Sequence, residues 1–391
     1  MSQPDETSPS RRFVFVTSNP FWGGSEALWS ATAGELKLQG HDVSVLLSRH
    51  APEAAPLERL AKLGCPVGVL DDFPLTPKKL ADRIRVLMPA ATGRYRNWAL
   101  ERRLRRVPAD SLVVISQAGN IDGRRFARVC RRLGLRYVLI SQKAQETIWP
   151  NDHMLEELHE AYGSATASFF VSEANRRLTE AQIGREIPRA VIVRNPFQAD
   201  WDLREDWPDE AGGLRLACVG RLYPFDKGQD LVIQVLALPK WRKRALRLTF
   251  FGSGNFLEGL SGMAAHLGVT SVEFGGFAAD PRAIWDRHHG LFLPSRGEGL
   301  PLVLVEAMMN GRVPVVTDVA GNAEVVDDNR TGFIAAAATI GAVDEALERA
   351  WQVRGRWREI GREAAMAIRT LVPPDPPAAF AAQLLRLSAD D

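Results

Sequence analysis

Short runs of β-branched and aromatic residues alternate with longer helical stretches twice along this 391-residue chain. In the first series, the apolar runs at 13–17 and 112–115 are followed by helical patterns at 25–39 and 123–133. Strands that alternate with helices in this way indicate a parallel, doubly wound sheet. A second series begins after position 196, so the sequence predicts an α/β chain with two such sheets.

Length and spacing indicate where the chain divides. A chain of 391 residues is longer than one typical domain, so two domains are the natural expectation. We expect an amino-terminal domain over residues 1–196, a carboxy-terminal domain over 197–372, and a last segment, 373–391, that opens with a proline cluster. The other predicted strands cover residues 43–47, 67–70, 137–140, 168–171, 190–193, 215–219, 247–251, 272–274, 290–293 and 313–317. The other predicted helices cover residues 77–88, 97–106, 154–162, 173–182 and 378–387.

Composition limits the cellular location. No apolar run approaches the roughly 20 residues that a membrane-spanning helix requires. Residues 1–12 are polar and include acids, so they do not resemble a signal peptide. Cys65, Cys130 and Cys218 are scattered without metal-ligand spacing, as is typical of a reducing cytoplasm. We therefore expect a cytoplasmic protein with no metal site.

The net charge of +2 conceals an asymmetry between the two halves. Residues 1–197 carry 28 Lys and Arg against 21 Asp and Glu, whereas residues 198–391 carry 21 against 26. The excess is densest at 78–106, and a second arginine cluster follows at 124–136. Such a region can hold an anionic acceptor or the inner face of an anionic membrane, or it can be a solvated helix face. Aromatic residues do not alternate with these arginines, which argues against nucleic acid as a partner.

The segment over residues 295–308 carries the strongest chemical signal. Glu298 and Glu306 lie eight residues apart, separated by a Gly-Leu-Pro turn and the start of a helical pattern. A helix N-terminus attracts phosphate, and carboxylates accept hydrogen bonds from sugar hydroxyls. A diphosphate on the amides of Leu302 and Val303, with a carboxylate toward either end, suits a nucleotide-sugar, which is a diphosphate with a sugar on each side.

Several segments, taken in order, resemble those of the retaining family 4 glycosyltransferases of GT-B fold. They are Gly23-Gly24-Ser25-Glu26, residues 191–197 (VIVRNPF), residues 220–228 (GRLYPFDKG), residues 251–254 (FGSG), residues 274–277 (FGGF), residues 295–308 and residues 314–326 (PVVTDVAGNAEVV). The resemblance implies two doubly wound Rossmann-like domains facing a central cleft, with a terminal helix that crosses back to the amino-terminal domain. It also implies a retaining, metal-independent transfer of a hexose.

Arg221 and Lys227 are the predicted phosphate cations. They lie between a predicted strand and a helix, at the sheet edge where doubly wound folds bind ligands. Positive charge there stabilises the charge that grows on the leaving phosphate. The resemblance implies that Glu298 contacts the donor sugar and that Glu306 contacts the ribose. The full set of expected donor-binding residues is Gly23, Gly24, Gly252, Phe277, Glu298, Gly299, Leu300, Leu302, Val303 and Glu306.

Further expectations concern Pro301, Phe277 and Glu26. Pro301 lacks an N–H group, so phosphate contact is assigned to the amides that follow it. Phe277 either packs on the nucleobase or belongs to the core. Glu26 is expected to serve the start of the first helix.

The amino-terminal catalytic residues depart from the family. Many members carry a histidine after the strand that ends here at position 140, whereas this chain continues Ser141-Gln142-Lys143-Ala144-Gln145-Glu146. Gln142 can offer a similar hydrogen bond to a sugar hydroxyl, and Glu146 can orient the acceptor or take its proton. The missing histidine leaves the identity of the sugar open.

We therefore predict a glycosyltransferase that uses a nucleoside-diphosphate sugar as substrate and binds no cofactor. The acceptor is a glycan, a lipid-linked sugar or a small molecule, in cell-envelope polysaccharide, glycolipid or other glycoconjugate synthesis. One alternative is a nucleotide-sugar-binding scaffold without turnover. Another is a different nucleotide-sugar enzyme of the same fold, such as an epimerase.

Overall fold

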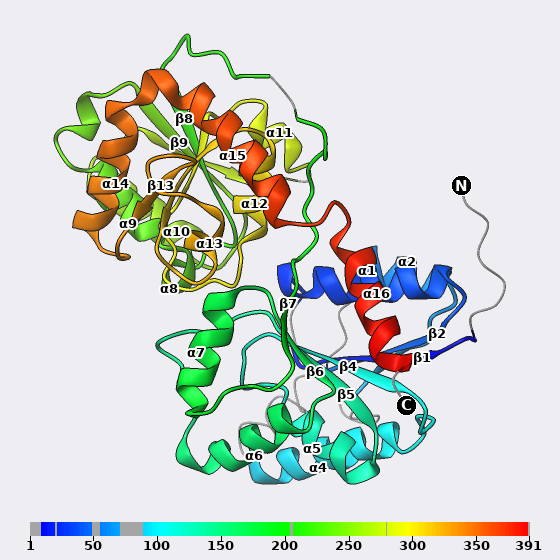
Figure 1. The fold of residues 1–391 in the computed structure, drawn as a ribbon. Coiled ribbons are helices and arrows are strands. Elements are labelled where there is room, and N and C mark those ends of the chain that lie inside the picture. Colours follow the sequence, from blue (N-terminus) through cyan, green and yellow to red (C-terminus); the bar gives the residue numbers. More distant parts are fainter. Residues whose placement is uncertain are drawn as a thin grey trace. The chain divides into compact units, whose positions relative to one another are not determined.

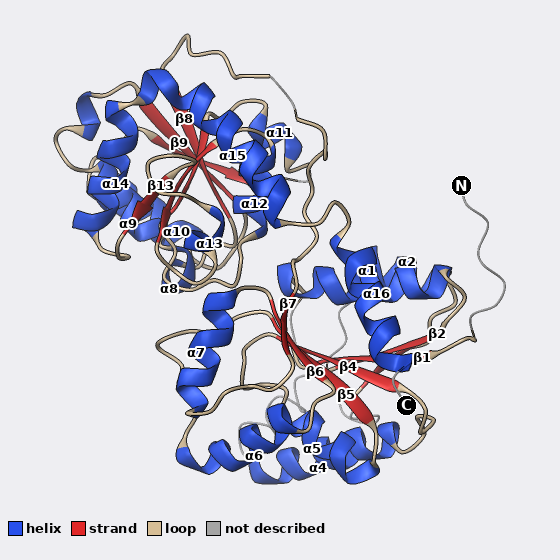
Figure 2. Cartoon of the chain, in the orientation of Figure 1, coloured by secondary structure: helices blue, strands red, loops and turns tan. Residues whose placement is uncertain are grey.

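The computed structural model describes residues 9–19, 22–48, 55–70, 89–203, 206–278 and 280–389, with the backbone alone for 89–96. The chain divides into two compact units. The first consists of Met1–Val171, Asn175–Asn195 and Asp375–Asp391, and the second of Ser172–Ala174 and Pro196–Pro374. Each unit contains one parallel sheet between layers of helices (Figure 1, Figure 2). The predicted α/β class with two doubly wound, Rossmann-like domains is confirmed, while their facing across a cleft stays a prediction.

The first unit has a seven-stranded sheet in the order β3-β2-β1-β4-β5-β6-β7. All of its strand pairs are parallel. The strands are β1 (Arg12–Thr17), β2 (Asp42–Leu47), β3 (Val67–Val69), β4 (Leu112–Gln117), β5 (Arg136–Ser141), β6 (Ala167–Phe170) and β7 (Ala190–Ile192). The helices are α1 (Ala27–Leu38), α2 (Ala55–Lys62), α4 (Pro89–Leu104), α5 (Arg124–Leu133), α6 (Asp152–Gly163), α7 (Glu173–Ile183) and α16 (Pro376–Ala389).

Both faces of this sheet are buried, which explains why its strands are continuous apolar runs. Successive side chains of a strand point to opposite faces. In β1, Phe13 and Phe15 therefore join the core under α1 and α16, whereas Val14 and Val16 join the core under α4, α5 and α6. The same alternation holds along β4 and β5. The helices on the two faces are separated in Figure 1.

The last helix, α16, completes the core of the first unit. Phe380, Ala381 and Leu384 are buried in the same cluster as the residues of α1. The ring of Phe380 meets that of Phe169 edge-on, with centroids 4.9 Å apart. α16 therefore packs beside α1, although nearly the whole chain separates them in sequence (Figure 1).

The second unit has a six-stranded parallel sheet in the order β10-β9-β8-β11-β12-β13. Its strands are β8 (Leu214–Val219), β9 (Leu246–Phe251), β10 (Val272–Gly276), β11 (Gly290–Leu293), β12 (Val313–Thr317) and β13 (Phe333–Ala335). Its helices are α8 (Pro224–Lys227), α9 (Gln229–Leu236), α10 (Leu257–His266), α11 (Arg282–Trp285), α12 (Leu302–Met309), α13 (Asn322–Val325), α14 (Ile340–Gln352) and α15 (Trp357–Leu371). α9, α10 and α14 pack on one face of the sheet, and α11, α12 and α15 pack on the other.

The predicted strands agree with the observed strands to within two residues at each end. The strand β13 and the helix α2 were not predicted, and the predicted helix at 97–106 is the end of the longer α4. The predicted helix at 77–88 lies outside the described residues.

Candidate functional site

The second sheet reverses its winding direction between β8 and β11. From β8 the chain moves outward to β9 and β10, and then returns to place β11, β12 and β13 on the other side. The loops that leave the carboxyl ends of β8 and β11 therefore diverge, and ligands of doubly wound folds bind in the opening between such loops. Residues 220–228 and 294–301 form these two loops, and they contain Arg221, Lys227 and Glu298.

Two glycines allow the loops at this edge to approach closely. Gly228 has φ +64°, and a Cβ atom there would lie 2.0 Å from the carbonyl oxygen of Pro294. Gly252 has φ +139°, and its Cβ would lie 2.0 Å from the carbonyl oxygen of Gly220. Any other residue would be excluded by backbone contact and by the unfavourable φ. The loop after β8 is thus held between the loops after β9 and β11.

Lys227 and Glu298 meet across this opening. The Lys227 Nζ lies 2.6 Å from Oε1 and 2.8 Å from Oε2 of Glu298. The Ser295 hydroxyl donates to the same Oε1 at 2.7 Å. Only 7% of the Glu298 side chain and 21% of the Lys227 side chain are exposed. The two residues predicted to hold phosphate and sugar are therefore paired with each other, and their partial burial strengthens the attraction.

The loop that carries Glu298 is anchored on both sides. The Thr317 hydroxyl donates to the Ser295 carbonyl oxygen at 2.6 Å. Arg296 donates through both terminal nitrogens to the Asp230 carboxylate, at 2.7 and 2.8 Å, and its backbone N–H donates to the backbone carbonyl oxygen of Asp226. These bonds fix the backbone of the loop, so the Glu298 side chain projects from a rigid support.

Glu306 is the second buried carboxylate of the site. It lies in α12, just over one turn from the start of the helix, as predicted. Its Oε1 accepts a hydrogen bond from the backbone N–H of Gln198 at 2.9 Å. Burial raises the pKa of Glu306 to about 7, and the Gln198 bond opposes this shift. The carboxylate therefore has unused acceptor capacity, which hydroxyl donors could fill.

The start of α12 supplies the predicted phosphate amides. Pro301 caps the helix in an extended conformation, and Leu302 is the first helical residue. The N–H of Leu304 donates to the Pro301 carbonyl, whereas the N–H groups of Leu302 and Val303 precede any helical partner. Gly299 accepts a hydrogen bond from the N–H of Gly321 at 2.9 Å, and Leu300 is buried in the core under α12.

Arg221 and Phe277 are exposed at the same edge of the sheet. The Arg221 guanidinium lies over the Tyr223 ring, 5.5 Å from its centroid. Phe277 directly follows β10 and is 78% exposed, so the core alternative for this residue is wrong. Both side chains are available to a ligand.

In the first unit, the corresponding reversal lies between β1 and β4. Gly23 and Gly24 follow β1 and begin the short helix that leads into α1. Glu26 is the N-cap residue of α1, at the helix start where it was expected, although its side chain makes no capping bond. Its buried carboxylate instead accepts hydrogen bonds from the four side chains of Thr17, Asn19, Ser25 and Trp29. These bonds tie the glycine loop to β1.

Gln142 and Glu146 lie in one loop after β5 but in different environments. Gln142 is buried, and its Oε1 accepts a hydrogen bond from Asn195 Nδ2 at 2.8 Å. Glu146 is exposed, and its carbonyl oxygen accepts a bond from the Trp149 ring nitrogen. The sequence did not single out Asn195, although its position in the VIVRNPF segment was a signal. Asn195 fixes one end of the Gln142 amide, and among the described residues neither Gln142 Nε2 nor Asn195 Oδ1 has a hydrogen-bond partner.

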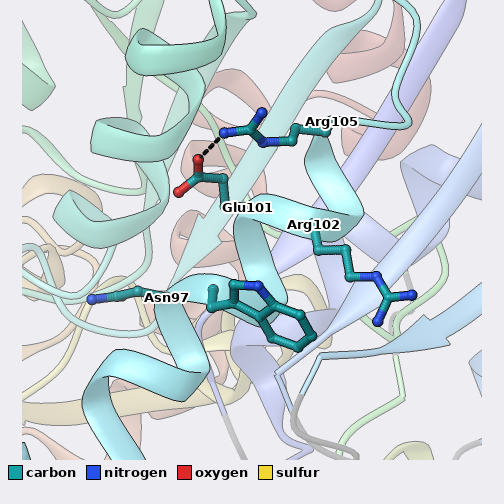
Figure 3. A pocket seen from close by; sticks show the side chains of 5 residues that line it. Asn97, Glu101, Arg102 and Arg105 are labelled. Carbon is teal, nitrogen blue, oxygen red and sulfur yellow. Dashed lines mark hydrogen bonds and ion pairs between the residues drawn. The ribbon is translucent and has the colours of Figure 1, made fainter.

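The arginines of α4 and α5 differ in their pairing. On α5, Arg124 and Arg128 contact Glu157, and Arg131 contacts Glu160, so α6 neutralises much of this second cluster. Just after the end of α4, Arg105 pairs with Glu101 of that helix at 2.5 Å (Figure 3). Arg102 lies over the Trp98 ring, 5.3 Å from its centroid. Arg103, on α4, and Arg106, just after it, have no carboxylate partner among the described residues. Trp98 is 53% exposed beside a hollow of about 400 Å³.

Within the part of the chain that the structure describes, no group of three or more histidine, cysteine or acidic side chains has the geometry to hold a metal ion. Among the helices of that same part, none combines the length and apolar character that crossing a membrane requires.

Residues 213–353 match the family model described as glycosyl transferases group 1. These residues are a group 1 domain within the second unit. The group 1 domain contains the paired Lys227 and Glu298, the α12 N-terminus and Glu306.

Curated relatives of this chain include a mannosyltransferase and a glycogen synthase. The chain is 30% identical over 245 residues to the GDP-mannose-dependent alpha-(1-6)-phosphatidylinositol monomannoside mannosyltransferase of Mycolicibacterium smegmatis, covering 56% of this chain and 62% of that protein. It is 30% identical over 163 residues to the glycogen synthase of Pseudomonas syringae, covering 41% of this chain and 33% of the enzyme. The chain thus spans less than two thirds of the length of these relatives.

Solved structures match the group 1 domain together with the first unit. The Anabaena protein HepE, in complex with UDP and glucose, has a TM-score of 0.73 at 17% identity, covering 97% of this chain and all of that chain. Sucrose-phosphate synthase from Thermosynechococcus elongatus has a TM-score of 0.72 at 16% identity, covering 96% and 98%. At these identities the likeness shows the shared fold, the GT-B combination of two Rossmann-like domains.

Proposed function

We propose that this protein is a retaining glycosyltransferase of family 4 that moves a hexose from a nucleoside-diphosphate sugar to an acceptor hydroxyl. The observation that carries this proposal is the meeting of Lys227 and Glu298 at the reversal between β8 and β11. A phosphate-binding cation, a sugar-binding carboxylate and a helix N-terminus converge there, as a nucleotide-sugar requires.

Each residue has a role in this proposal. Lys227, Arg221 and the first amides of α12 hold the diphosphate and take the place of the metal ion that other transferases use. Glu298 accepts hydrogen bonds from the donor sugar, and Glu306 accepts them from the ribose. Gly252 and Phe277 lie after β9 and β10, where we place the nucleoside. HepE binds UDP on the same fold.

The chemistry then needs no protein nucleophile. The bond between the anomeric carbon and the β-phosphate oxygen breaks, and the acceptor oxygen bonds to the same face of that carbon. The proton of the acceptor hydroxyl passes to the leaving phosphate, whose growing negative charge Lys227 and Arg221 stabilise. Retention of the anomeric configuration follows from attack on the same face.

We assign the acceptor to the first unit, together with Gly23, Gly24, Gln142 and Glu146. The unfilled Nε2 group of Gln142 supplies a hydrogen-bond donor where many family members have a histidine. The α4 surface, with Trp98 beside Arg102, Arg103 and Arg106, suits an anionic membrane that presents a lipid-linked acceptor, because tryptophan and arginine favour the headgroup region. The acceptor belongs to cell-envelope polysaccharide, glycolipid or other glycoconjugate synthesis.

The test is thermal unfolding of the native protein and Glu306→Ala with UDP-, GDP-, ADP-, dTDP- and CMP-sugars. A ligand that binds only the folded state raises the melting temperature. We expect one nucleotide to stabilise the native protein and Glu306→Ala to lose that shift. No shift with any of the five classes would refute the proposal. The anomeric configuration of the product, read by proton NMR, then tests retention.

A nucleotide-sugar-binding scaffold is the alternative, and the absence of the family histidine beside Gln142 favours it. It predicts the same thermal shifts with no release of free nucleoside diphosphate in the presence of acceptor mixtures. An epimerase predicts a changed sugar still attached to the nucleotide. Chromatography of the nucleotide products separates these outcomes from transfer.

A further inference from the structure

In the proposed donor site, the ion pair of Lys227 and Glu298 joins the residue that holds phosphate to the residue that holds the sugar. Lys227 ends α8, after β8, and Glu298 lies in the loop after β11. The ammonium group contacts both carboxylate oxygens, and apart from it the only hydrogen bond to the Glu298 side chain among the described residues is that of the Ser295 hydroxyl. The group proposed to hold phosphate is therefore engaged by the group proposed to hold sugar.

We propose that Glu298 makes the site select the nucleotide-sugar over the bare nucleoside diphosphate, because it competes with phosphate for Lys227 whenever no sugar is present. This inference rests on the proposed function and concerns the same site. It gives Glu298 a second role, in discriminating substrate from product.

The Glu298 carboxylate opposes binding of a bare nucleoside diphosphate through its charge and through its need for hydrogen bonds. A diphosphate that approaches Lys227 must share or displace the Glu298 carboxylate, which lies 2.6 Å from the ammonium nitrogen. If it displaces the carboxylate, Glu298 keeps one hydrogen bond, from Ser295, in a largely buried position. If it shares the ammonium, two anions lie close together in a site of reduced dielectric. Either arrangement weakens the binding of a nucleoside diphosphate.

The sugar of the donor removes this disadvantage. Its hydroxyl groups donate hydrogen bonds to Glu298 and replace those lost from Lys227, since a carboxylate accepts about four such bonds. A bare nucleoside diphosphate has no hydroxyl at that end. Once the sugar has left, Glu298 regains Lys227, and this recapture favours release of the product.

The experiment is isothermal titration of the native protein, Glu298→Gln and a control, Glu258→Gln, with UDP, GDP, UDP-glucose and GDP-mannose. Glu258 lies in the first turn of α10, in the same unit, and its replacement removes the same charge. For the nucleotide that the native protein binds, we expect Glu298→Gln to tighten the diphosphate by about tenfold, as loss of a nearby like charge implies. The same change should weaken the nucleotide-sugar, and Glu258→Gln should alter neither.

The outcomes separate the two proposals. If the native protein binds the ligands but Glu298→Gln leaves the diphosphate unchanged or weaker, the inference is refuted and the proposed function stands. If the thermal-unfolding test selects another base, its diphosphate and its sugar replace these four ligands. If the native protein binds none of them and no nucleotide-sugar of that test, the proposed function fails and this inference fails with it. Glu298→Ala, checked for folding by circular dichroism, is also expected to bind the diphosphate more tightly and the nucleotide-sugar more weakly than the native protein. This variant shows that the change does not come from the amide that glutamine introduces.

Discussion

Replacing Glu306 by glutamine should remove a specific pH dependence of stability. The pKa of Glu306 is raised from 4.5 to about 7, chiefly by burial, so the folded state favours the protonated carboxyl. The stability that protonation provides is complete below pH 4.5 and is lost as the pH rises through 7. The whole shift corresponds to about 3 kcal/mol, of which about 2.5 kcal/mol falls between pH 5 and pH 8.

Urea unfolding at pH 5, 6.5 and 8 measures this effect. Glutamine stays neutral and keeps an oxygen for the Gln198 N–H group, so the stability of Glu306→Gln relative to the native protein should rise by about 2.5 kcal/mol from pH 5 to pH 8. Glu345→Gln is the matched control, because that side chain is 72% exposed in the same unit. A difference between Glu306→Gln and the native protein that stays constant with pH, or an equal change in the control, would refute the reasoning.

Three other predictions follow from the same structure. The affinity for a nucleotide-sugar should rise between pH 6 and pH 8 in the native protein, because ribose hydroxyls donate to an ionised Glu306, and titration calorimetry should show no such rise in Glu306→Gln. Gly228→Ala should lower the free energy of unfolding by about 3 kcal/mol or more, whereas Gly134→Ala, at a similar φ with open space around it, should lower it by about 1 kcal/mol. Trp98→Ala should reduce co-sedimentation with phosphatidylglycerol vesicles severalfold, while Trp149→Ala, similarly exposed in the loop after β5, should not. Equal losses within either matched pair would contradict the corresponding argument.

The sheets were predictable from the sequence because their strands are buried on both faces. The runs around Phe15, Val114 and Leu139 are apolar at successive positions, a pattern that is typical of strands covered by helices on both sides. The edge strand β13 has only three residues and no such run, so local pattern could not identify it. The helix α2 was missed for a related reason, since one buried residue, Leu60, leaves little apolar signal.

The candidate site was predictable in its parts but not in its contacts. Motif order placed Lys227, Glu298 and Glu306 near strand ends and a helix start. The pairing of Lys227 with Glu298 depends on the neighbouring positions of β8 and β11, which join residues 71 positions apart. The hydrogen bond between Asn195 and Gln142 likewise depends on the end of β7 lying near the end of β5. Such contacts are properties of strand order, which a single sequence does not display.

The position of α16 has a consequence for how the protein is made. Its buried Phe380, Ala381 and Leu384 complete the core around α1, so the unit that is synthesised first is finished last. Until residues 376–389 have left the ribosome, one apolar face of α1 has no intramolecular cover, while the second unit has every strand it needs. During synthesis, the second unit can therefore complete its core before the first unit does.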